Sequence, residues 1–356
     1  MILYPMYPIR GFICILMKKC IAMKKKISVF LMLFFCLRLG GQEKPDVSMM
    51  FWNLENFFDW RDDGRSDSDK EFSSYGARHW TRKKFYAKCE AVAKAVMWVG
   101  SREGSMPDVI GVAEVENRFV LERLVHDTVL RKYGYRIVHF ESPDPRGIDL
   151  GLLYREDKLV LQNAAPLEIR AEKGKELKTR DILLAEFRFK TAGSADGAAS
   201  SDEGFAVLVN HHPSKYGGAG TGWKRQAAMR RLGEAADSLE KEGISHIAAA
   251  GDFNDTPDNV VLPESEGSGL VNLASAMAKS GRGSIRYNGK WELIDMFMVS
   301  PELEPMAEME IVEVPFLMVR DNVHAGVKPL RTYSGPRYLG GVSDHCPILL
   351  RICRKP

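Results

Sequence analysis

The sequence predicts an α/β (α+β) domain in which two packed β-sheets carry helices on their outer faces. Three observations support this prediction. Strand-like runs outnumber helical ones, and the helices fall between strands without the strict alternation of a doubly wound sheet. No segment of about 20 to 50 residues recurs, which argues against a solenoid or a propeller. With 45% hydrophobic and 27% charged residues in a chain of 356, a large core can be buried.

The predicted strands are short apolar runs, and several of them end in polar side chains. A buried strand that finishes in polar residues is a common place for functional groups at a sheet edge. These runs are spread along the whole chain, so we expect one catalytic domain over residues 42–356. The predicted strands are residues 47–53, 108–114, 137–140, 150–154, 183–189, 205–210, 247–250, 293–299 and 347–352.

Three segments have the spacing of amphipathic helices. The first is predicted at residues 81–99, with a threonine as its N-cap. The others are predicted at residues 119–130 and 223–240. Residues 59–70 read as a long polar loop, and residues 191–204, rich in Gly, Ala and Ser, as a flexible hairpin tip.

The beginning of the chain has the layout of a secretory signal peptide. Three lysines at 24–26 precede an apolar run at 27–37, and small residues follow. The run is too short to span a bilayer comfortably, so cleavage is expected rather than a transmembrane anchor. We therefore predict a signal peptide region at residues 1–41, with Met23 as an alternative start of translation. The protein is expected to be exported to the periplasm, the cell surface or the medium, and a lipid anchor at Cys36 is the alternative.

The predicted cleavage changes the charge of the chain. It removes seven basic side chains and no acidic one, which leaves 43 Lys and Arg against 47 Asp and Glu. A slightly acidic protein lacks the broad basic surface that non-specific nucleic-acid binders use. No stable protein partner is predicted.

The cysteines left after cleavage are Cys89, Cys346 and Cys353. Three cysteines cannot all pair within one chain, and none of them has the spacing of a Cys/His zinc site. We expect neither a disulfide scaffold nor a structural zinc site from them.

The segment around Asp252 and Asn254 carries the strongest chemical signal. An apolar strand runs directly into these two residues, and alternation at the strand end points both side chains the same way. A carboxylate can activate water, and a neighbouring amide can contact a phosphoryl oxygen. Because Asp and Asn also form turns, this segment alone leaves a turn and a site equally open.

Three further carboxylates and an imidazole lie at the ends of predicted strands or within one. Asp344 and His345 come directly before the last predicted strand, where an imidazole can act as base, acid or phosphate ligand. Glu114 ends an apolar run in the manner of a hard-cation ligand. Asp295 interrupts an apolar strand, and a buried aspartate needs a partner such as the His345 imidazole.

A fourth strand end concentrates basic groups. His211, His212 and Lys215 lie within five positions of one another after residues 205–210. A histidine pair can bind zinc, but no third ligand follows at a suitable spacing. Anion recognition is therefore the favoured interpretation of this segment.

Taken together, these segments resemble the endonuclease/exonuclease/phosphatase superfamily, which includes deoxyribonuclease I. The match covers nearly the whole chain after the signal peptide region, and its short motifs occur in the family order. They are Trp52-Asn53-Leu54-Glu55-Asn56, Val112-Ala113-Glu114-Val115, Gly147-Ile148-Asp149-Leu150-Gly151-Leu152-Leu153-Tyr154, Asn210-His211-His212-Pro213-Ser214, Gly251-Asp252-Phe253-Asn254, Ile294-Asp295 and Ser343-Asp344-His345.

The resemblance implies a deoxyribonuclease I-like, four-layer sandwich of two mixed β-sheets flanked by helices. It also implies Mg²⁺ as cofactor, with Mn²⁺ as an alternative ion. By position, the metal ligands would be Asn53, Glu114 and Asp344. The residues implied to be catalytic are His211, Asp252, Asn254, Asp295 and His345: Asp252 would orient or deprotonate the attacking water, Asn254 and His211 would stabilise phosphoryl oxygens, and Asp295 would hold His345.

On the substrate side, the resemblance leaves Arg146, Asp149, His212 and Lys215 as candidates. The expected function is hydrolysis of a phosphodiester, with nucleic acid the favoured substrate because exported members of the superfamily are often nucleases. A lipid head group or small phosphorylated metabolite is the first alternative, consistent with the acidic charge. A non-catalytic binding module is the remote one, since every expected catalytic position is filled.

Overall fold

The computed structural model describes residues 46–171, 176–190, 199–215, 218–260 and 269–353, which fall in one compact unit. The predicted signal peptide region lies outside these residues. None of the described helices has the length and apolar character needed to cross a membrane.

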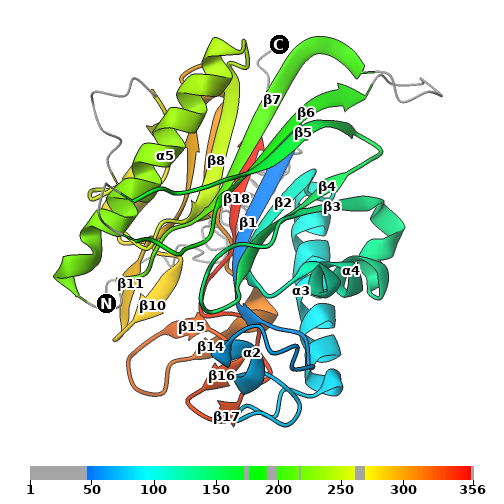
Figure 1. Ribbon diagram of the computed structural model, residues 1–356, viewed down its shortest axis with the longest axis vertical. Coiled ribbons are helices and arrows are strands. Elements are labelled where there is room, and N and C mark those ends of the chain that lie inside the picture. Colours follow the sequence, from blue (N-terminus) through cyan, green and yellow to red (C-terminus); the bar gives the residue numbers. More distant parts are fainter. Residues whose placement is uncertain (1–45, 172–175, 191–198, 216–217, 261–268, 354–356) are drawn as a thin grey trace, which may run out of the picture. The chain divides into compact units, whose positions relative to one another are not determined.

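Two mixed six-stranded sheets form the centre of this unit (Figure 1). The first has the order β13-β18-β1-β2-β4-β3 and the second the order β5-β6-β7-β8-β12-β9. The first sheet consists of β1 (Val47–Phe57), β2 (Val109–Val115), β3 (Tyr135–His139), β4 (Asp149–Arg155), β13 (Ala307–Ile311) and β18 (Ile348–Ile352). The second consists of β5 (Leu159–Leu167), β6 (Ile182–Lys190), β7 (Ala199–His211), β8 (His246–Asp252), β9 (Val271–Asn272) and β12 (Asp295–Val299).

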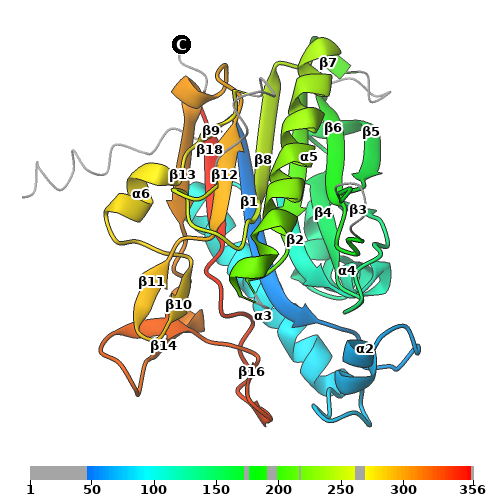
Figure 2. The same cartoon turned by 60° about the vertical axis from the view of Figure 1, so that its left-hand side comes forward.

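Helices cover the outer faces of both sheets (Figures 1 and 2). α3 (Arg82–Glu103) and α4 (Arg118–His126) pack on the first sheet, and α5 (Gly222–Lys241) packs on the second. This gives the predicted four layers and confirms the predicted fold class. The remaining elements are α2 (Asp67–Glu71), α6 (Ser275–Lys279), the 3-10 turns at Val129–Tyr133, Ala219–Thr221, Glu304–Met306 and Pro315–Leu317, and three small hairpins: β10 (Ile285–Tyr287) with β11 (Lys290–Glu292), β14 (Met318–Arg320) with β15 (Val327–Pro329), and β16 (Tyr333–Ser334) with β17 (Arg337–Tyr338).

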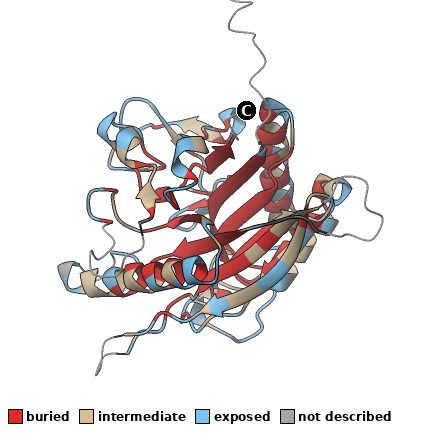
Figure 3. Ribbon diagram, turned by 90° about the horizontal axis from the view of Figure 1, so that it is seen from above, coloured by how far each residue is buried: buried red, intermediate tan, exposed pale blue. Residues whose placement is uncertain are grey.

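Alternation along β1 divides the core in two. Met49 and Phe51 face the second sheet, whereas Met50 and Trp52 face α3. Gly111 lets the sheets approach closely, because a Cβ there would lie 3.2 Å from side-chain atoms of both Phe51 and a valine of β7. The central strands β1, β2, β8, β12 and β18 are buried almost throughout (Figure 3).

Most predicted elements are confirmed, with some corrections. Thr81 caps α3, its side chain accepting a hydrogen bond from the Lys84 amide. The polar loop at 59–70 contains the start of α2, which Ser66 caps. In the expected hairpin tip, residues 191–198 lie outside the described residues, but β7 already begins at Ala199, so the tip is shorter than predicted.

Candidate active site

The predicted catalytic side chains meet where the central strands of the two sheets end. β1 is parallel to β2 and β7 is parallel to β8, so each pair ends on the same side of its sheet. β12 is antiparallel to β8 and places its first residue opposite the last residue of β8. The side chains joined by contacts here are Asn53, Glu114, His211, Asp252, Asp295, Asp344 and His345.

Asp252, Asp295 and His345 form a buried trio at the centre of the site. The Nδ1 of His345 donates to Asp295 Oδ2 at 2.7 Å, and its Nε2 lies 3.8 Å from Asp252 Oδ2. The hydroxyl oxygen of Ser343 accepts the His345 amide at 2.9 Å, and that of Ser284 accepts the Asp295 amide at 3.2 Å. The imidazole is therefore held with Nε2 toward Asp252.

Burial and charge act in opposite directions on this trio. Burial disfavours a charged imidazole, but the Asp295 and Asp252 carboxylates raise the pKa of His345 well above its usual value. Burial raises the pKa of Asp252 to about 7, although His345 opposes the rise. The trio thus holds a charged imidazole beside a carboxyl group that exchanges its proton near neutral pH.

Asp252 is contacted from three sides. The side-chain amide of Asn53 donates to its Oδ2 at 3.0 Å, and the backbone amide of Asn254 donates to its Oδ1 at 2.9 Å. The Nε2 of His211 lies 3.7 Å from Asp252 Oδ2 and 3.9 Å from Glu114 Oε1. His211 therefore bridges the end of β8 and the end of β2.

Glu114 has a strained backbone at the end of β2. Its φ of 61° is a left-handed conformation that residues with a Cβ rarely adopt, and the pairing register with β4 shifts at this point. Its Oε2 accepts the Asn56 amide at 2.8 Å, and a guanidinium nitrogen of Arg146 lies 3.4 Å away. Such strain costs about 1–3 kcal/mol and is found mainly at functional sites. Here it turns the carboxylate toward His211.

Asp344 lies at the edge of the site in a network of charges. A guanidinium nitrogen of Arg331 is 3.1 Å from Asp344 Oδ2 and 2.8 Å from Glu55 Oε1. The buried Lys88 donates to the Glu55 carbonyl at 2.7 Å. Burial lowers the pKa of Lys88 to about 8, and burial together with Asp344 raises that of Glu55 to about 7. The network links Asp344 to the body of α3.

A comparison with known protein families shows to which family the chain belongs. Residues 48–354 match the family model described as the Endonuclease/Exonuclease/phosphatase family. The chain belongs to this family. It is accordingly a phosphoesterase, a hydrolase of phosphate esters in a family that is typically metal-dependent. No curated protein sequence matches the chain.

Solved structures support the family fold. The catalytic domain of human nocturnin, with a bound sulfate anion, is 17% identical with a TM-score of 0.51, covering 87% of this chain and 95% of that one. The mannosyl-6-phosphatase of Bacteroides thetaiotaomicron is 14% identical with a TM-score of 0.53, covering 87% and 100%. TDP2 from Caenorhabditis elegans is 13% identical with a TM-score of 0.52, covering 89% and 78%. At these identities the similarity shows the fold alone.

The oxygen donors of the site fit the divalent cation typical of the family. Glu114 and Asp344 are carboxylates with 12% and 23% exposed side chains, and each faces an arginine. Burial lowers the pKa of Lys88, and Glu55, Glu114 and Asp344 partly oppose that effect, so negative charge surrounds the buried amine. Hard cations prefer carboxylate oxygens, which Glu114 and Asp344 supply. The amide oxygen of Asn53 already accepts the Glu55 backbone amide at 2.9 Å and has one further lone pair for a cation. The ligand atoms of Asp252, Asp295 and His345 also lie within 4.8 Å of one another. Against burial, the Asp295 and Asp252 carboxylates raise the pKa of His345, and a charged imidazole has no free lone pair for a cation.

Two predicted residues beside the site have other partners. Asn254, with φ of 51°, donates through its side-chain amide to the His212 carbonyl at 2.9 Å. His212 packs edge-on against Phe253, and burial with nearby arginines lowers its pKa to about 3, so its imidazole is neutral. Burial and nearby arginines also lower the pKa of His211 well below its usual value. Both histidines are therefore neutral at physiological pH.

The substrate-side candidates are placed differently from one another. Arg146 reaches Glu114, and its side chain is 43% exposed at the rim of the site. Lys215 is half-exposed and pairs with Asp255 at 3.0 Å, next to the site. Asp149 is buried and lies 3.2 Å from His139; among the described residues, no contact joins it to the predicted catalytic side chains.

Sequence reasoning gave no role to Glu55, Arg331 and Lys88. Arg331 lies in an irregular segment with no periodicity to mark it. Glu55 stands inside the motif that begins at Trp52, and Lys88 lies three positions after Phe85 on the buried face of its helix. A lysine on an apolar helix face was the one available signal for this network.

Proposed function

We propose that this phosphoesterase is an exported, Mg²⁺-dependent phosphodiesterase that acts on nucleic acid. The observation that carries the proposal is the convergence of Asn53, His211 and His345 on the single carboxyl group of Asp252. A carboxyl group with a pKa of about 7 is suited to accept a proton from water at neutral pH.

The residues have distinct roles in this proposal. Asp252 orients the attacking water and accepts its proton. His345, kept charged and oriented by Asp295, stabilises the negative charge that develops on the phosphoryl group. His211 is neutral and donates a hydrogen bond to a phosphoryl oxygen, with Asn254 beside it.

Glu114, Asp344 and Asn53 hold Mg²⁺ in the proposal. When bound, the ion polarises the phosphoryl oxygens and offsets their charge. The two arginines that face these carboxylates, Arg146 and Arg331, then become available to contact the substrate. Mn²⁺ is expected to substitute because it also accepts carboxylate ligands.

A small phosphorylated metabolite or a lipid head group is the second candidate substrate. The acidic balance of 43 basic against 47 acidic side chains after residue 41 favours it. A similar fold belongs to a mannosyl-6-phosphatase, which extends the range of substrates to test. Export rests on the signal-peptide layout of residues 1–41.

A substrate panel tests the proposal. Plasmid DNA, RNA, sphingomyelin, inositol phosphates and mannose 6-phosphate are incubated with the purified protein, with Mg²⁺ or with chelator. Cleavage of DNA or RNA that requires the ion is the expected result. Binding to nucleic acid is also expected to weaken with salt, with a log–log slope of about −0.7 to −0.9 per phosphate contacted. Turnover of only the small esters, with little salt dependence, would favour the second candidate.

A further inference from the structure

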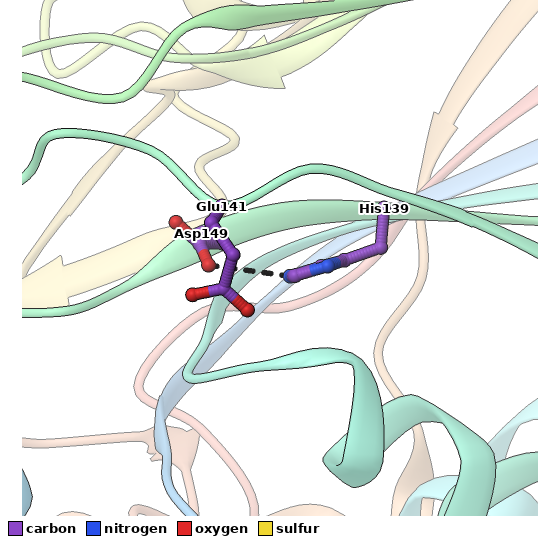
Figure 4. A group of neighbouring side chains, drawn as sticks. All are labelled: His139, Glu141 and Asp149. Atoms are coloured by element: carbon purple, nitrogen blue, oxygen red, sulfur yellow. Dashed lines mark ion pairs between the residues drawn. The ribbon is translucent and has the colours of Figure 1, made fainter.

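A second group of metal-binding side chains lies at the base of the β3–β4 hairpin. His139 is the last residue of β3, Asp149 is the first of β4, and Glu141 lies in the loop between them. One ligand atom from each lies within 4.8 Å of the other two. In Figure 4 the imidazole and the two carboxylates are gathered in one place, with a marked ion pair between His139 and Asp149.

The imidazole of His139 is buried, and its Nε2 lacks a hydrogen bond among the described residues. Its side chain is 3% exposed, and within the described residues its Nε2 has no hydrogen-bond partner. Nε2 lies 3.2 Å from Asp149 Oδ2, close enough for a hydrogen bond, so it is the alignment that fails. A buried nitrogen left in this way is destabilising unless another ligand satisfies it.

Asp149 directs an oxygen at this nitrogen, and a carboxylate oxygen of Glu141 lies within 4.8 Å of it. Asp149 uses Oδ1 to accept the Ser142 amide at 2.9 Å, and its Oδ2 faces His139. Glu141 contacts Arg65 at 2.9 Å on the surface, and its side chain is 58% exposed. An exposed ion pair of this kind contributes little, so Glu141 can turn inward at low cost.

We propose that His139, Glu141 and Asp149 bind a divalent transition ion, with Zn²⁺ as the probe. Zn²⁺ takes imidazole nitrogen and carboxylate oxygen at about 2.0–2.2 Å in tetrahedral sites. Water completes the coordination. Mg²⁺ prefers oxygen ligands in octahedral geometry, so it competes poorly for a site built on an imidazole. The earlier expectation against structural zinc concerned cysteine ligands, and none takes part here.

An ion bound here would link the two ends of the loop between β3 and β4, which reaches the active site. The loop carries Arg146, which donates to Asn56 at 2.8 Å and lies 3.4 Å from Glu114. Its other anchor is a buried ion pair between Asp144 and Arg180 at 2.6 Å. The ion therefore positions the loop from one side while that ion pair holds it from the other.

Zn²⁺ binding to the purified protein tests the proposal. The protein is treated with chelator, returned to excess Mg²⁺, and titrated with Zn²⁺ against a chromophoric chelator. Wild type is expected to bind one equivalent, and Glu141→Gln, which changes an exposed side chain and leaves the core intact, to bind it at least tenfold more weakly. His139→Gln is expected to lose that equivalent, and His126→Gln, at an exposed histidine of α4, to match wild type.

The active-site variant Asp252→Asn shows whether Zn²⁺ binds at the β3–β4 hairpin or in the trio around His345. It is expected to keep the equivalent that His139→Gln loses. No Zn²⁺ binding by wild type would overturn the proposal, and so would equal affinity in wild type, Glu141→Gln and His139→Gln. Loss of the equivalent in Asp252→Asn alone would place the ion in the catalytic trio and would also overturn it.

Discussion

Two groups in this protein each join one histidine to two carboxylates, and they differ in how the imidazole is held. In the catalytic trio, His345 makes a 2.7 Å hydrogen bond to Asp295, so one ring nitrogen is fixed and the other faces Asp252. In the β3–β4 hairpin, the Nε2 of His139 has no aligned acceptor among the described residues. We propose proton transfer for the first group, where two carboxylates raise the pKa of the His345 imidazole against the effect of burial. We propose metal binding for the second, where a buried ring nitrogen is left without a hydrogen bond.

The largest effect is expected from Asp252→Asn. The substitution keeps the shape of the side chain but removes the base, so kcat should fall by about 10³–10⁴, at the upper end of the range for general acid–base catalysis. Initial rates with Mg²⁺ measure it, and circular dichroism checks the fold. Asp258→Asn, at an exposed aspartate nearby, is the matched control. A variant that kept a tenth of the activity would remove Asp252 from the role of base.

The same substitution at the two histidines compares the groups directly. His345→Gln is expected to lower kcat by about 10²–10³, because the charged donor facing Asp252 is lost. His139→Gln should change kcat by less than about fivefold, because that imidazole does not contact the catalytic residues. Parallel kinetics on the two variants measure the contrast. Equal losses would show that the groups are not functionally separate.

Asp295→Asn tests how the trio is oriented. We expect kcat to fall by roughly 10–10², near the lower end of the same range. Without the carboxylate, burial lowers the pKa of His345, so the charged form is lost at lower pH. The alkaline limit of the pH–rate profile should therefore move to lower pH. An unchanged profile, with activity merely scaled down, would assign Asp295 a structural role only.

The smallest effect concerns stability. The pKa of Asp252 is raised from 3.8 to about 7 on folding, so the folded state binds its proton more tightly. Stability from this group is therefore present below about pH 4 and is lost as the pH rises toward 7. In metal-free buffer above pH 7, Asp252→Asn should melt roughly 2–6 °C higher than wild type, and the two should converge at pH 4. A lower melting temperature at pH 8 would contradict this sign.

Much of the fold follows from the sequence because its strands are apolar and buried. The runs ending at Asn53, Glu114 and Asp252 finish in polar side chains, and that transition marks both the strand and the site. β5 was missed because it lies at a sheet edge and is half exposed, so it has no continuous apolar run. The three small hairpins were missed because their strands have only two or three residues each, too few to show a pattern.

The charge network beside the site could not be predicted. Arg331 becomes important only because it reaches Glu55, 276 positions earlier in the chain, and Asp344. No local pattern encodes such a distance. Asp149, a substrate-side candidate from its motif, lies beside His139 at the end of β3, and its contact with substrate stays a prediction.

The pairing of β1 with β18 brings the first and last described strands side by side. The Trp52 indole, next to Asn53, donates to the backbone carbonyl of His345, 293 positions later, so the two sides of the site meet only after the intervening chain has been made. Contacts so distant in sequence form slowly, after local structure. If the chain is exported, as the proposed function requires, and is still unfolded at that stage, the site would be assembled only after export.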